Sequence, residues 1–465
     1  MIALTLAEVA DAVGGRLTGG DAGAPVTGAV TIDSRTVGAG DLFVALPGER
    51  VDGADFLPAA AAAGAAGALA TRADDALPVV VVDDPVAALG RLATAVHGRL
   101  TGDGLVTLGI TGSSGKTSTK DLLGQVLAAD GPTVSPPGSF NNDIGLPLTV
   151  LSADAATRYL VLEMGARGIG HIARLCAVAR PRIGVVLNVG SAHLGEFGSP
   201  EGTAQAKGEL VEALPADGTA VLNADDPRVI GMASRTRAQV LTTGLGDRAD
   251  VRAVDVALDG EGRAAFTLVA AGEQHPVRLQ VVGGHQVANA LSAAGAALAA
   301  GMAPAAVATA LSAAQVRSRW RMEVTRRADG VTVVNDAYNA NPESMRAALA
   351  AVTGMSGTRR VAVLGAMGEL GPTAAEEHER LGRDAIAAGV EIVVAVGPDA
   401  VGIATGARAA GAPDGEGSVH VPDRAAARAL LTEVLVPGDV VLVKASRAYG
   451  LELLAADLLD DGTTA

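Results

Sequence analysis

An apolar run, a glycine-rich loop and a helix-forming segment follow one another at residues 105–128. The run LVTLGIT leads into GSSGKTS, and the backbone N–H groups of such a loop can bind phosphate oxygens at the start of a helix. Lys116 would then reach the β- and γ-phosphates, and the Thr117 hydroxyl could bind magnesium. The predicted triphosphate site consists of Gly112, Ser113, Ser114, Gly115, Lys116, Thr117 and Ser118.

This loop is a short form of the phosphate-binding motif. The strict pattern G-x-x-x-x-G-K-[ST] requires glycine at position 110, where this chain has Ile110. The remaining G-x-x-G-K-T could be an ordinary glycine turn, but its place between a predicted strand and a predicted helix favours phosphate binding.

The length and patterning of the chain indicate three α/β domains. At roughly 150 residues per domain, a chain of 465 residues is too long for one core. We expect a small mixed α/β N-terminal domain at 1–103, a central P-loop ATPase-like parallel-sheet domain at 104–316 and a Rossmann-like C-terminal domain at 317–465. The last has the strand–helix rhythm but lacks the G-x-G-x-x-G fingerprint.

Local patterns predict the elements of these domains. In the first domain we expect short strands at VTIDS, LFVALP and PVVVVDD and an alanine-rich helix near residues 56–70. The central strands are continuously apolar, as in a parallel sheet covered on both faces. Residues 249–283 alternate between apolar and polar, which predicts antiparallel hairpins, and helices are expected at about 285–300 and 303–314.

Composition narrows the partners to small molecules. A net charge of −15 and 2% aromatic residues argue against binding to nucleic acid or anionic lipid. The single cysteine, Cys176, removes disulfide frameworks and thiolate zinc sites. The N-terminus lacks a basic region, and the chain has no stretch of about 18 apolar residues. We therefore expect a soluble, cytoplasmic, monomeric enzyme with no membrane insertion.

Polar residues at the ends of the central strands are the next candidates. Glu163 follows YLVL and His193 follows VVLNVGSA, and the carboxyl ends of parallel strands border the crevice where α/β sheets bind ligands. Either residue alone could be structural, but with the loop they indicate a metal and phosphate site. Lys207, in EGTAQAKGELVEAL, reads as an ordinary solvated helix lysine from its pattern alone.

The second half of the chain adds further polar clusters. His285 and Asn289 lie four residues apart at a predicted helix start, where they could hold a base or tie down a loop. Arg319 and Arg321 enter the third domain, and an arginine there could reach a transferring phosphoryl group or form a surface salt bridge. The other candidates are Asp336, Tyr338, Asn339, Asn341, Lys444 and Ser446. At this stage a kinase, a GTPase-like switch and a ligase all remain open.

The order of the motifs resolves this choice through a resemblance. The strings TGSSGKTSTKD, FNNDIGLPLTVL, LEMGARGIGHI, NVGSAHLGEFGS, AKGEL, HQVANAL, RWRMEV, DAYNANPESM and KASRAYGLE together resemble the Mur ligases of peptidoglycan synthesis. Coverage is essentially the whole chain, including TIDSRTVGAGDLFVALPGERVDG, which is similar to the segment of the family that binds the UDP-sugar. DAYNANP is the most discriminating string. The resemblance at this string implies ATP-dependent joining of D-alanyl-D-alanine to UDP-N-acetylmuramoyl-tripeptide through an acyl phosphate.

The resemblance also implies roles for individual residues. Lys116 and Thr117 match residues that bind triphosphate and one magnesium ion, and Glu163 and His193 match residues for a second ion and the phosphate. Lys207 matches a lysine that many members carry as a carbamate, which is an oxygen ligand. The nucleotide contacts would be Asn289, Asp336 and Asn341, and Arg321 would approach the phosphates. The substrate contacts would be Ser34, Arg35, Asn141, Asn142, Lys444 and Ser446.

The catalytic set expected from the resemblance is therefore Lys116, Glu163, His193, Lys207 and Arg321, with ATP and two magnesium ions. His193 is the better candidate for the base that deprotonates the incoming amine. The rivals are the family member that adds the third residue of the same peptide, a non-catalytic ATP-binding module and a P-loop kinase. A non-catalytic switch would not need Glu163, His193 and Lys207 together.

Overall fold

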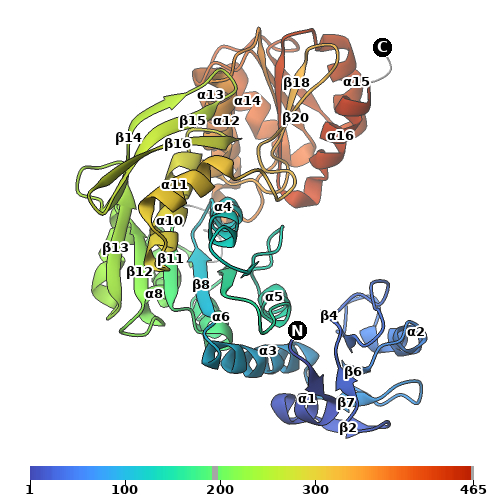
Figure 1. Ribbon diagram of the computed structural model, residues 1–465. Helices are drawn as coiled ribbons and strands as arrows, with labels where there is room; N and C mark the ends of the chain where they lie inside the picture. Colours follow the sequence, from blue (N-terminus) through green and yellow to red (C-terminus); the bar gives the residue numbers. More distant parts are fainter. Residues whose placement is uncertain (191–196, 462–465) are drawn as a thin grey trace.

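A computed structural model of the chain describes residues 1–190 and 197–461. Figure 1 shows three α/β units, with the N-terminal unit and the C-terminal unit at opposite ends of the central one. The strands form sheets of two, five, nine and six strands. The α/β class predicted from the sequence is confirmed.

The N-terminal unit contains a five-stranded sheet of order β2-β7-β6-β5-β4 and the antiparallel pair β1-β3. Its strands are β1 (Leu4–Thr5), β2 (Arg16–Thr18), β3 (Pro25–Val26), β4 (Val30–Thr31), β5 (Leu42–Val44), β6 (Gly67–Ala70) and β7 (Val79–Val81). Its helices are α1 (Leu6–Val13), the 3-10 helix η1 (Gly53–Phe56) and α2 (Leu57–Ala62).

The alanine-rich helix expected at residues 56–70 is wrong over its second half. Helix α2 ends at Ala62, and residues 67–70 form β6, which is fully buried between β5 and β7. Gly64 takes a left-handed φ of +91° just after the helix, and a Cβ at Gly67 would lie 2.7 Å from Leu6 Cδ2. Close packing of the sheet against α1 thus overrides the helical preference of the alanines.

Helix α3 (Pro85–Gly102) connects the N-terminal unit to the central one. Asp84 caps it by accepting hydrogen bonds from the N–H groups of Val86 and Ala87. The helix packs against α1 on one side and against α5 (Gly145–Leu151) and α6 (His171–Ala179) on the other. One continuous apolar cluster therefore spans both units.

The central unit is built on the nine-stranded sheet, of order β16-β15-β14-β13-β12-β11-β8-β10-β9. The strands from β9 to β14 across the sheet are parallel, and β14, β15 and β16 are antiparallel, which confirms the hairpins expected at 249–283. The strands are β8 (Val106–Thr111), β9 (Thr133–Val134), β10 (Tyr159–Glu163), β11 (Ile183–Val186), β12 (Thr219–Asn223), β13 (Gln239–Gly244), β14 (Val251–Leu258), β15 (Arg263–Ala270) and β16 (Glu273–Val282).

Helices cover both faces of this sheet. One face packs against α4 (Lys116–Ala128), α10 (Gln286–Ala299) and α11 (Pro304–Ala313), and the other against α3, α5, α6 and α8 (Pro200–Glu212). Short helices α9 (Pro227–Ile230) and η2 (Gly231–Arg235) follow β12. The chain runs from β8 to β9 and β10 on one side and then to β11 on the other, so the strand order reverses at β8. Ligands of open α/β sheets bind at such a switch point.

The C-terminal unit is a six-stranded sheet of order β17-β18-β22-β19-β20-β21, parallel except for β17. Its strands are β17 (Glu323–Arg326), β18 (Thr332–Asn335), β19 (Arg360–Gly365), β20 (Ile392–Val396), β21 (Ser418–Val421) and β22 (Val440–Lys444). Its helices are α12 (Pro342–Thr353), η3 (Gly371–Thr373), α13 (Ala374–Ala387), η4 (Pro398–Ala400), α14 (Val401–Ala409), α15 (Arg424–Val434), η5 (Arg447–Tyr449) and α16 (Leu451–Asp461). The Rossmann-like rhythm expected from the sequence is confirmed.

Within residues 1–190 and 197–461, no helix has the length and apolar character needed to cross a membrane.

Candidate active site

The predicted phosphate loop joins β8 to α4 at the switch point of the central sheet. Gly115 adopts a left-handed φ of +81° immediately before α4, and a Cβ there would collide with Asn289 of α10. Lys116 folds back over the loop and donates a 2.7 Å hydrogen bond to the Gly112 carbonyl oxygen. The helix thus starts at the loop, with Lys116, Thr117 and Ser118 in its first turn.

Asn188, which lies two residues after β11, shapes the same loop. Its Oδ1 accepts 3.0 Å hydrogen bonds from both the Ser113 N–H and the Ser114 N–H, and its Nδ2 donates to the Ser114 carbonyl oxygen at 3.2 Å. Sequence reasoning missed this residue. The available signal was its place at the end of a buried strand, in the same motif as His193.

Glu163, the last residue of β10, is the carboxylate nearest the loop. It is 2% exposed. Its Oε2 accepts a 2.8 Å hydrogen bond from Thr117 Oγ1, and its Oε1 accepts bonds from Ser139 Oγ at 2.7 Å and Asn141 Nδ2 at 2.8 Å. The structure therefore brings the predicted residues Thr117, Glu163 and Asn141 together, with Ser139 as an additional member.

Charges near Glu163 control its ionisation. Burial alone would raise the pKa of Glu163, but the charges of Lys116 and Arg321 and the bonds from Ser139 and Thr117 lower it below its ordinary value. Burial, together with the Arg321 guanidinium, lowers the pKa of Lys116, while Glu163 opposes that shift. The site thus holds one carboxylate that interacts electrostatically with two basic side chains.

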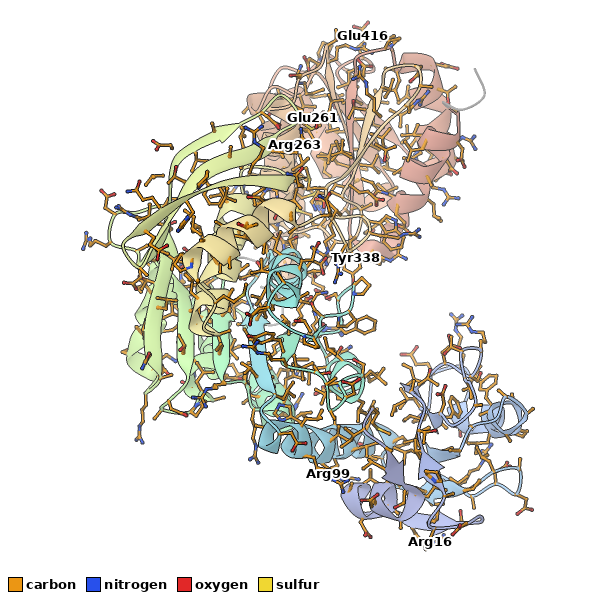
Figure 2. All side chains as sticks on the ribbon, in the orientation of Figure 1. Arg16, Arg99, Glu261, Arg263, Tyr338 and Glu416 are labelled. Atoms are coloured by element: carbon orange, nitrogen blue, oxygen red, sulfur yellow. The ribbon has the colours of Figure 1, made fainter. Side chains whose placement is uncertain are left out.

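Arg321 comes from the C-terminal side of the junction between the units. Its guanidinium stacks on the Tyr338 ring, 4.1 Å from the ring centroid, and Figure 2 shows Tyr338 at the edge of the C-terminal unit that faces α4. Its Nε is enclosed and has no hydrogen-bond partner among the described residues. The neighbours Trp320 and Met322 both have positive φ, +59° and +50°. Such strained backbone is common where a functional side chain must be aimed.

The start of α10 contacts both units. Asn289 is buried beside Gly115 of the loop, and its Nδ2 donates a 2.9 Å hydrogen bond to Gln286 Oε1. Burial lowers the pKa of His285, the charge of Asp336 raises it and Lys444 lowers it. The predicted pair His285 and Asn289 thus lies between the phosphate loop and the C-terminal unit.

Lys444 and Asp336 form a buried ion pair in the C-terminal unit. Lys444 Nζ lies 2.6 Å from Asp336 Oδ2 and also donates a 2.8 Å hydrogen bond to the Asn339 carbonyl oxygen. The other carboxylate oxygen of Asp336 accepts from the Met322 N–H at 3.0 Å, next to Arg321. The pair therefore fixes the segment that carries Arg321.

Asn341 and Ser446 stabilise backbone nearby. Asn341 caps α12 by accepting a 2.9 Å hydrogen bond from the Ser344 N–H, and Ser446 Oγ accepts one from the Gly368 N–H at 2.8 Å. Gly190 of the central unit lies against α12, because a Cβ there would come within 2.8 Å of Glu343 Cδ. The N-terminus of α12 thus borders the phosphate loop.

Lys207 is buried in α8, with 3% of its surface exposed. Burial, with a contribution from the Lys116 charge, lowers its pKa well below the ordinary value for lysine. No carboxylate among the described residues forms an ion pair with it. The solvated helix lysine that patterning suggested is therefore wrong, and a neutral amine is favoured at this position.

The remaining predicted residues lie in the N-terminal unit, next to Asn141 of the cluster or outside the described residues. Ser34 and Arg35 follow β4 in the N-terminal unit, and Arg35 is exposed and paired with Asp33 at 2.6 Å. Asn142 Oδ1 accepts a 2.8 Å hydrogen bond from the Gly145 N–H at the start of α5. His193 lies outside the described residues.

The cluster is suited to binding phosphates and metal cations that prefer oxygen ligands. The part of the chain that the structure describes has no group of three His, Cys, Asp or Glu side chains arranged to hold a metal ion. A hydroxyl, a carboxylate and phosphate oxygens are nonetheless the hard ligands that magnesium prefers, and Thr117 and Glu163 supply the first two. Fold and site together define a P-loop nucleotide-binding enzyme whose site is shared by two α/β units.

Comparison with known proteins gives the family. The chain matches the descriptions Mur ligase family, catalytic domain at residues 27–97, Mur ligase middle domain at 110–297 and Mur ligase, glutamate ligase domain at 320–447. It is 50% identical to the UDP-N-acetylmuramoyl-tripeptide–D-alanyl-D-alanine ligase of Mycobacterium tuberculosis, over 100% of this chain and 99% of that protein. The chain belongs to the Mur ligase family, whose members are ATP-dependent ligases.

Solved structures agree with this assignment. A crystal structure of MurF from Acinetobacter baumannii has a TM-score of 0.88 at 31% identity, covering 98% of this chain and 99% of that one. A MurF ligase from Thermotoga maritima in complex with ADP has a TM-score of 0.80 at 30% identity, covering 94% and 98%.

Proposed function

We propose that this chain joins D-alanyl-D-alanine to UDP-N-acetylmuramoyl-tripeptide, with hydrolysis of ATP to ADP and phosphate, in peptidoglycan precursor synthesis. The observation that carries the proposal is the convergence of Lys116 of α4, Glu163 of β10 and Arg321 of the segment before β17 at the phosphate loop. The names of the relatives supply the substrates. The use of ATP favours a cytoplasmic location, and we propose that the chain acts as a monomer.

The chemistry requires activation of a carboxylate. The γ-phosphoryl group is transferred to the terminal carboxylate of the tripeptide, which gives an acyl phosphate and ADP. The amine of D-alanyl-D-alanine then attacks the acyl carbon, so that a C–N bond forms, the C–O bond to phosphate breaks and the ammonium proton passes to a base. Lys116 and Arg321 would stabilise charge on the transferring group. We propose His193 as a metal ligand and not as the base, because the second nitrogen of a metal-bound imidazole carries a proton.

The first magnesium ion would be held by Thr117 and Glu163, which meet beside the loop. Glu163, His193 and Lys207 are the proposed ligands for a second ion. Magnesium would screen the charge between two anions, the triphosphate and the carboxylate. Lys207 fits only as a carbamate, because neither an amine nor an ammonium group supplies an oxygen ligand.

Carbamate formation suits the environment of Lys207. The neutral amine is the nucleophile: its nitrogen attacks CO2, an N–C bond forms and one proton is released. The lowered pKa of Lys207 favours this neutral form. A carbamate would also place a negative charge near Lys116, which offsets the cost of burying two basic side chains together.

Each of the three units would bind a different part of the substrates. We propose that residues 1–103 bind the UDP-sugar through Ser34 and Arg35, that 104–316 bind ATP and the tripeptide through Asn141 and Asn142, and that 317–465 bind the dipeptide near Lys444 and Ser446. Asn289, Asp336 and Asn341 would contact the nucleotide. Catalysis would then require the central and C-terminal units to be closed on each other.

Phosphate release tests this proposal. The chain should release phosphate from ATP when both UDP-N-acetylmuramoyl-tripeptide and D-alanyl-D-alanine are present, and much more slowly when the dipeptide is omitted. Release that ignores the dipeptide would defeat the assignment. Turnover that requires a dipeptide-length UDP substrate and a free diamino acid would favour the family member that adds the third residue.

A further inference from the structure

A line of polar side chains runs along α4 away from the phosphate loop. Thr117, Asp121 and Gln125 are spaced four residues apart, so they lie on one face of the helix. Thr117 bonds to Glu163 of β10, whereas Asp121 and Gln125 bond to the linker that connects α11 to β17. The helix that starts at the phosphate loop therefore also holds the chain leading to Arg321.

Gln125 binds the linker through both of its amide atoms. Its Nε2 donates a 2.9 Å hydrogen bond to the Gln315 carbonyl oxygen, and its Oε1 accepts a 3.0 Å bond from the Gln315 N–H. The side chain of Gln315 takes no part, because its own Nε2 donates to the Ala313 carbonyl oxygen. Gln125 thus holds the main chain at this position and not a particular side chain.

Asp121 holds the linker three residues further on. It is 7% exposed, its Oδ2 accepts a 3.0 Å hydrogen bond from the Ser318 N–H, and its Oδ1 pairs with Lys120 Nζ at 2.7 Å. Lys120 Nζ also donates to the Pro136 carbonyl oxygen. Each carboxylate oxygen therefore has one partner, and Asp121 joins α4, the linker and the loop after β9.

Ser318 connects this junction to the catalytic carboxylate. Its hydroxyl accepts a 2.8 Å hydrogen bond from the Gly138 N–H, and the next residue, Ser139, donates to Glu163 Oε1. Ser318 is 3% exposed. Ser318, three residues before Arg321, is thus linked to Glu163 through the Gly138–Ser139 segment.

We propose that Asp121 and Gln125 are positioning residues for Arg321. They fix the linker to the phosphate-loop helix up to Ser318, and Asp336 holds Met322 from the C-terminal side. Arg321 therefore lies in a short segment that is anchored at one end to α4, the helix that carries Lys116 and Thr117, and at the other end to the C-terminal unit. This inference rests on the proposed function of Arg321.

Asp121→Asn tests the proposal through its coupling to Arg321. The remaining amide oxygen would be taken by the charged Lys120, and the new NH2 would face the Ser318 N–H, donor against donor. We expect kcat to fall about tenfold with the KM for ATP changed less than about threefold, because misplacement of a catalytic group by a fraction of an ångström has costs of this order. The wild type is measured first and must show phosphate release that depends on the dipeptide. If it does not, the proposed function is wrong, and the roles of Asp121 and Gln125 are not what has failed.

A double-mutant cycle separates positioning from general damage. In the Arg321→Ala background, Asp121→Asn should lower kcat less than about twofold, because the group that it positions is already gone. An equal fall in both backgrounds would overturn the proposal.

Gln125→Ala provides a second test in case Asp121→Asn folds poorly. It removes both bonds to Gln315 from a half-exposed position, and we expect kcat to fall several-fold with the same dependence on Arg321. Gln315→Ala is the matched control, since it removes an amide of the same size and leaves the held main chain intact; it should match the wild type.

Hydrogen exchange gives a readout independent of activity. The Gln315 and Ser318 amides should be protected in the wild type, and the Ser318 amide should lose protection in Asp121→Asn while the β17 amides keep theirs. Equal exchange of the Ser318 amide in both proteins would contradict the proposal.

Discussion

Thr117 Oγ1 donates a 2.8 Å hydrogen bond to Glu163 Oε2, which joins the first turn of α4 to the end of β10. The bond is buried, and Glu163 is the carboxylate whose pKa is lowered by the charges of Lys116 and Arg321. These two side chains are also the proposed oxygen ligands for magnesium. The site is therefore assembled around one charged oxygen group.

Removing the charge of Glu163 should abolish most activity. Glu163→Gln keeps the shape of the side chain but leaves Lys116 and Arg321 without their anion. We expect kcat to fall about 100-fold or more, as for other losses of charge stabilisation in a transition state. Steady-state phosphate release at several magnesium concentrations checks this. Glu201→Gln, which alters an exposed ion pair with Arg228, should be unaffected, and a fully active Glu163→Gln would remove Glu163 from the mechanism.

Asn188 should affect nucleotide binding more than chemistry. Because its side chain shapes the loop through Ser113 and Ser114, Asn188→Ala should raise the KM for ATP about tenfold by leaving loop groups unpaired, with kcat changed only a few-fold. Initial rates measured at varied ATP concentrations separate the effect on KM from the effect on kcat. Asn223→Ala is a comparison at the next strand end, where the side-chain amide donates to the Leu187 carbonyl oxygen and accepts from the Asp225 N–H. An unchanged KM in Asn188→Ala would show that the loop keeps its shape without it.

The sequence predicted the structure correctly where a chemically distinctive motif stands at the end of a segment with clear strand or helix periodicity. The strand–loop–helix at Gly112, the hairpins at 249–283 and the helix that starts at Pro342 all have local signals, and the structure has each of them. Glu163, Asp336 and Lys444 stand at or directly after strand ends, as their patterns predict.

Other features depend on contacts between distant segments, so no local pattern reveals them. Residues 67–70 read as helix, because alanine favours helices and only their packing in the sheet makes them a strand. Asp121 and Ser318 stand beside other polar residues in the sequence, so nothing local distinguishes them. Lys207 looked solvated because its helix is polar, and its burial became visible only in three dimensions.

Lys207 should be required for turnover through its carbamate. Lys207→Ala should lose most activity, and bicarbonate or a short carboxylate added to suitable variants should partly restore it by replacing the lost oxygen ligand. Phosphate release measured with and without each additive checks this. Full activity of Lys207→Ala would exclude the carbamate role. Loss of activity with an unchanged melting temperature would separate it from a folding defect.

His97 should make stability depend on pH. It is buried in α3, where Nε2 contacts Thr107 Oγ1 of β8 at 2.8 Å, and burial, with Arg180, lowers its pKa from 6.5 to about 4. Between these values the unfolded chain binds a proton at His97 and the folded chain does not. The contribution of neutral His97 to the free energy of unfolding is therefore complete above pH 6.5 and is lost as the pH falls toward 4. About 2 kcal/mol of the free energy of unfolding should be lost by pH 5.

Unfolding at pH 7 and pH 5 measures this effect. His97→Gln should be less stable than the wild type at pH 7 but should lose less stability on acidification. His275→Gln replaces a histidine near the surface in β16 and should retain the acid sensitivity of the wild type. An identical loss in the wild type and His97→Gln would show that other groups account for it.

The mass of the reaction product tests the central claim most directly. The chain is incubated with ATP, magnesium, UDP-N-acetylmuramoyl-tripeptide and D-alanyl-D-alanine, and the nucleotide-sugar products are identified by mass spectrometry. The account predicts UDP-N-acetylmuramoyl-pentapeptide in amounts equal to the phosphate released, and no such product from Lys116→Ala. Phosphate release without the pentapeptide, or a pentapeptide formed equally by Lys116→Ala, would contradict it.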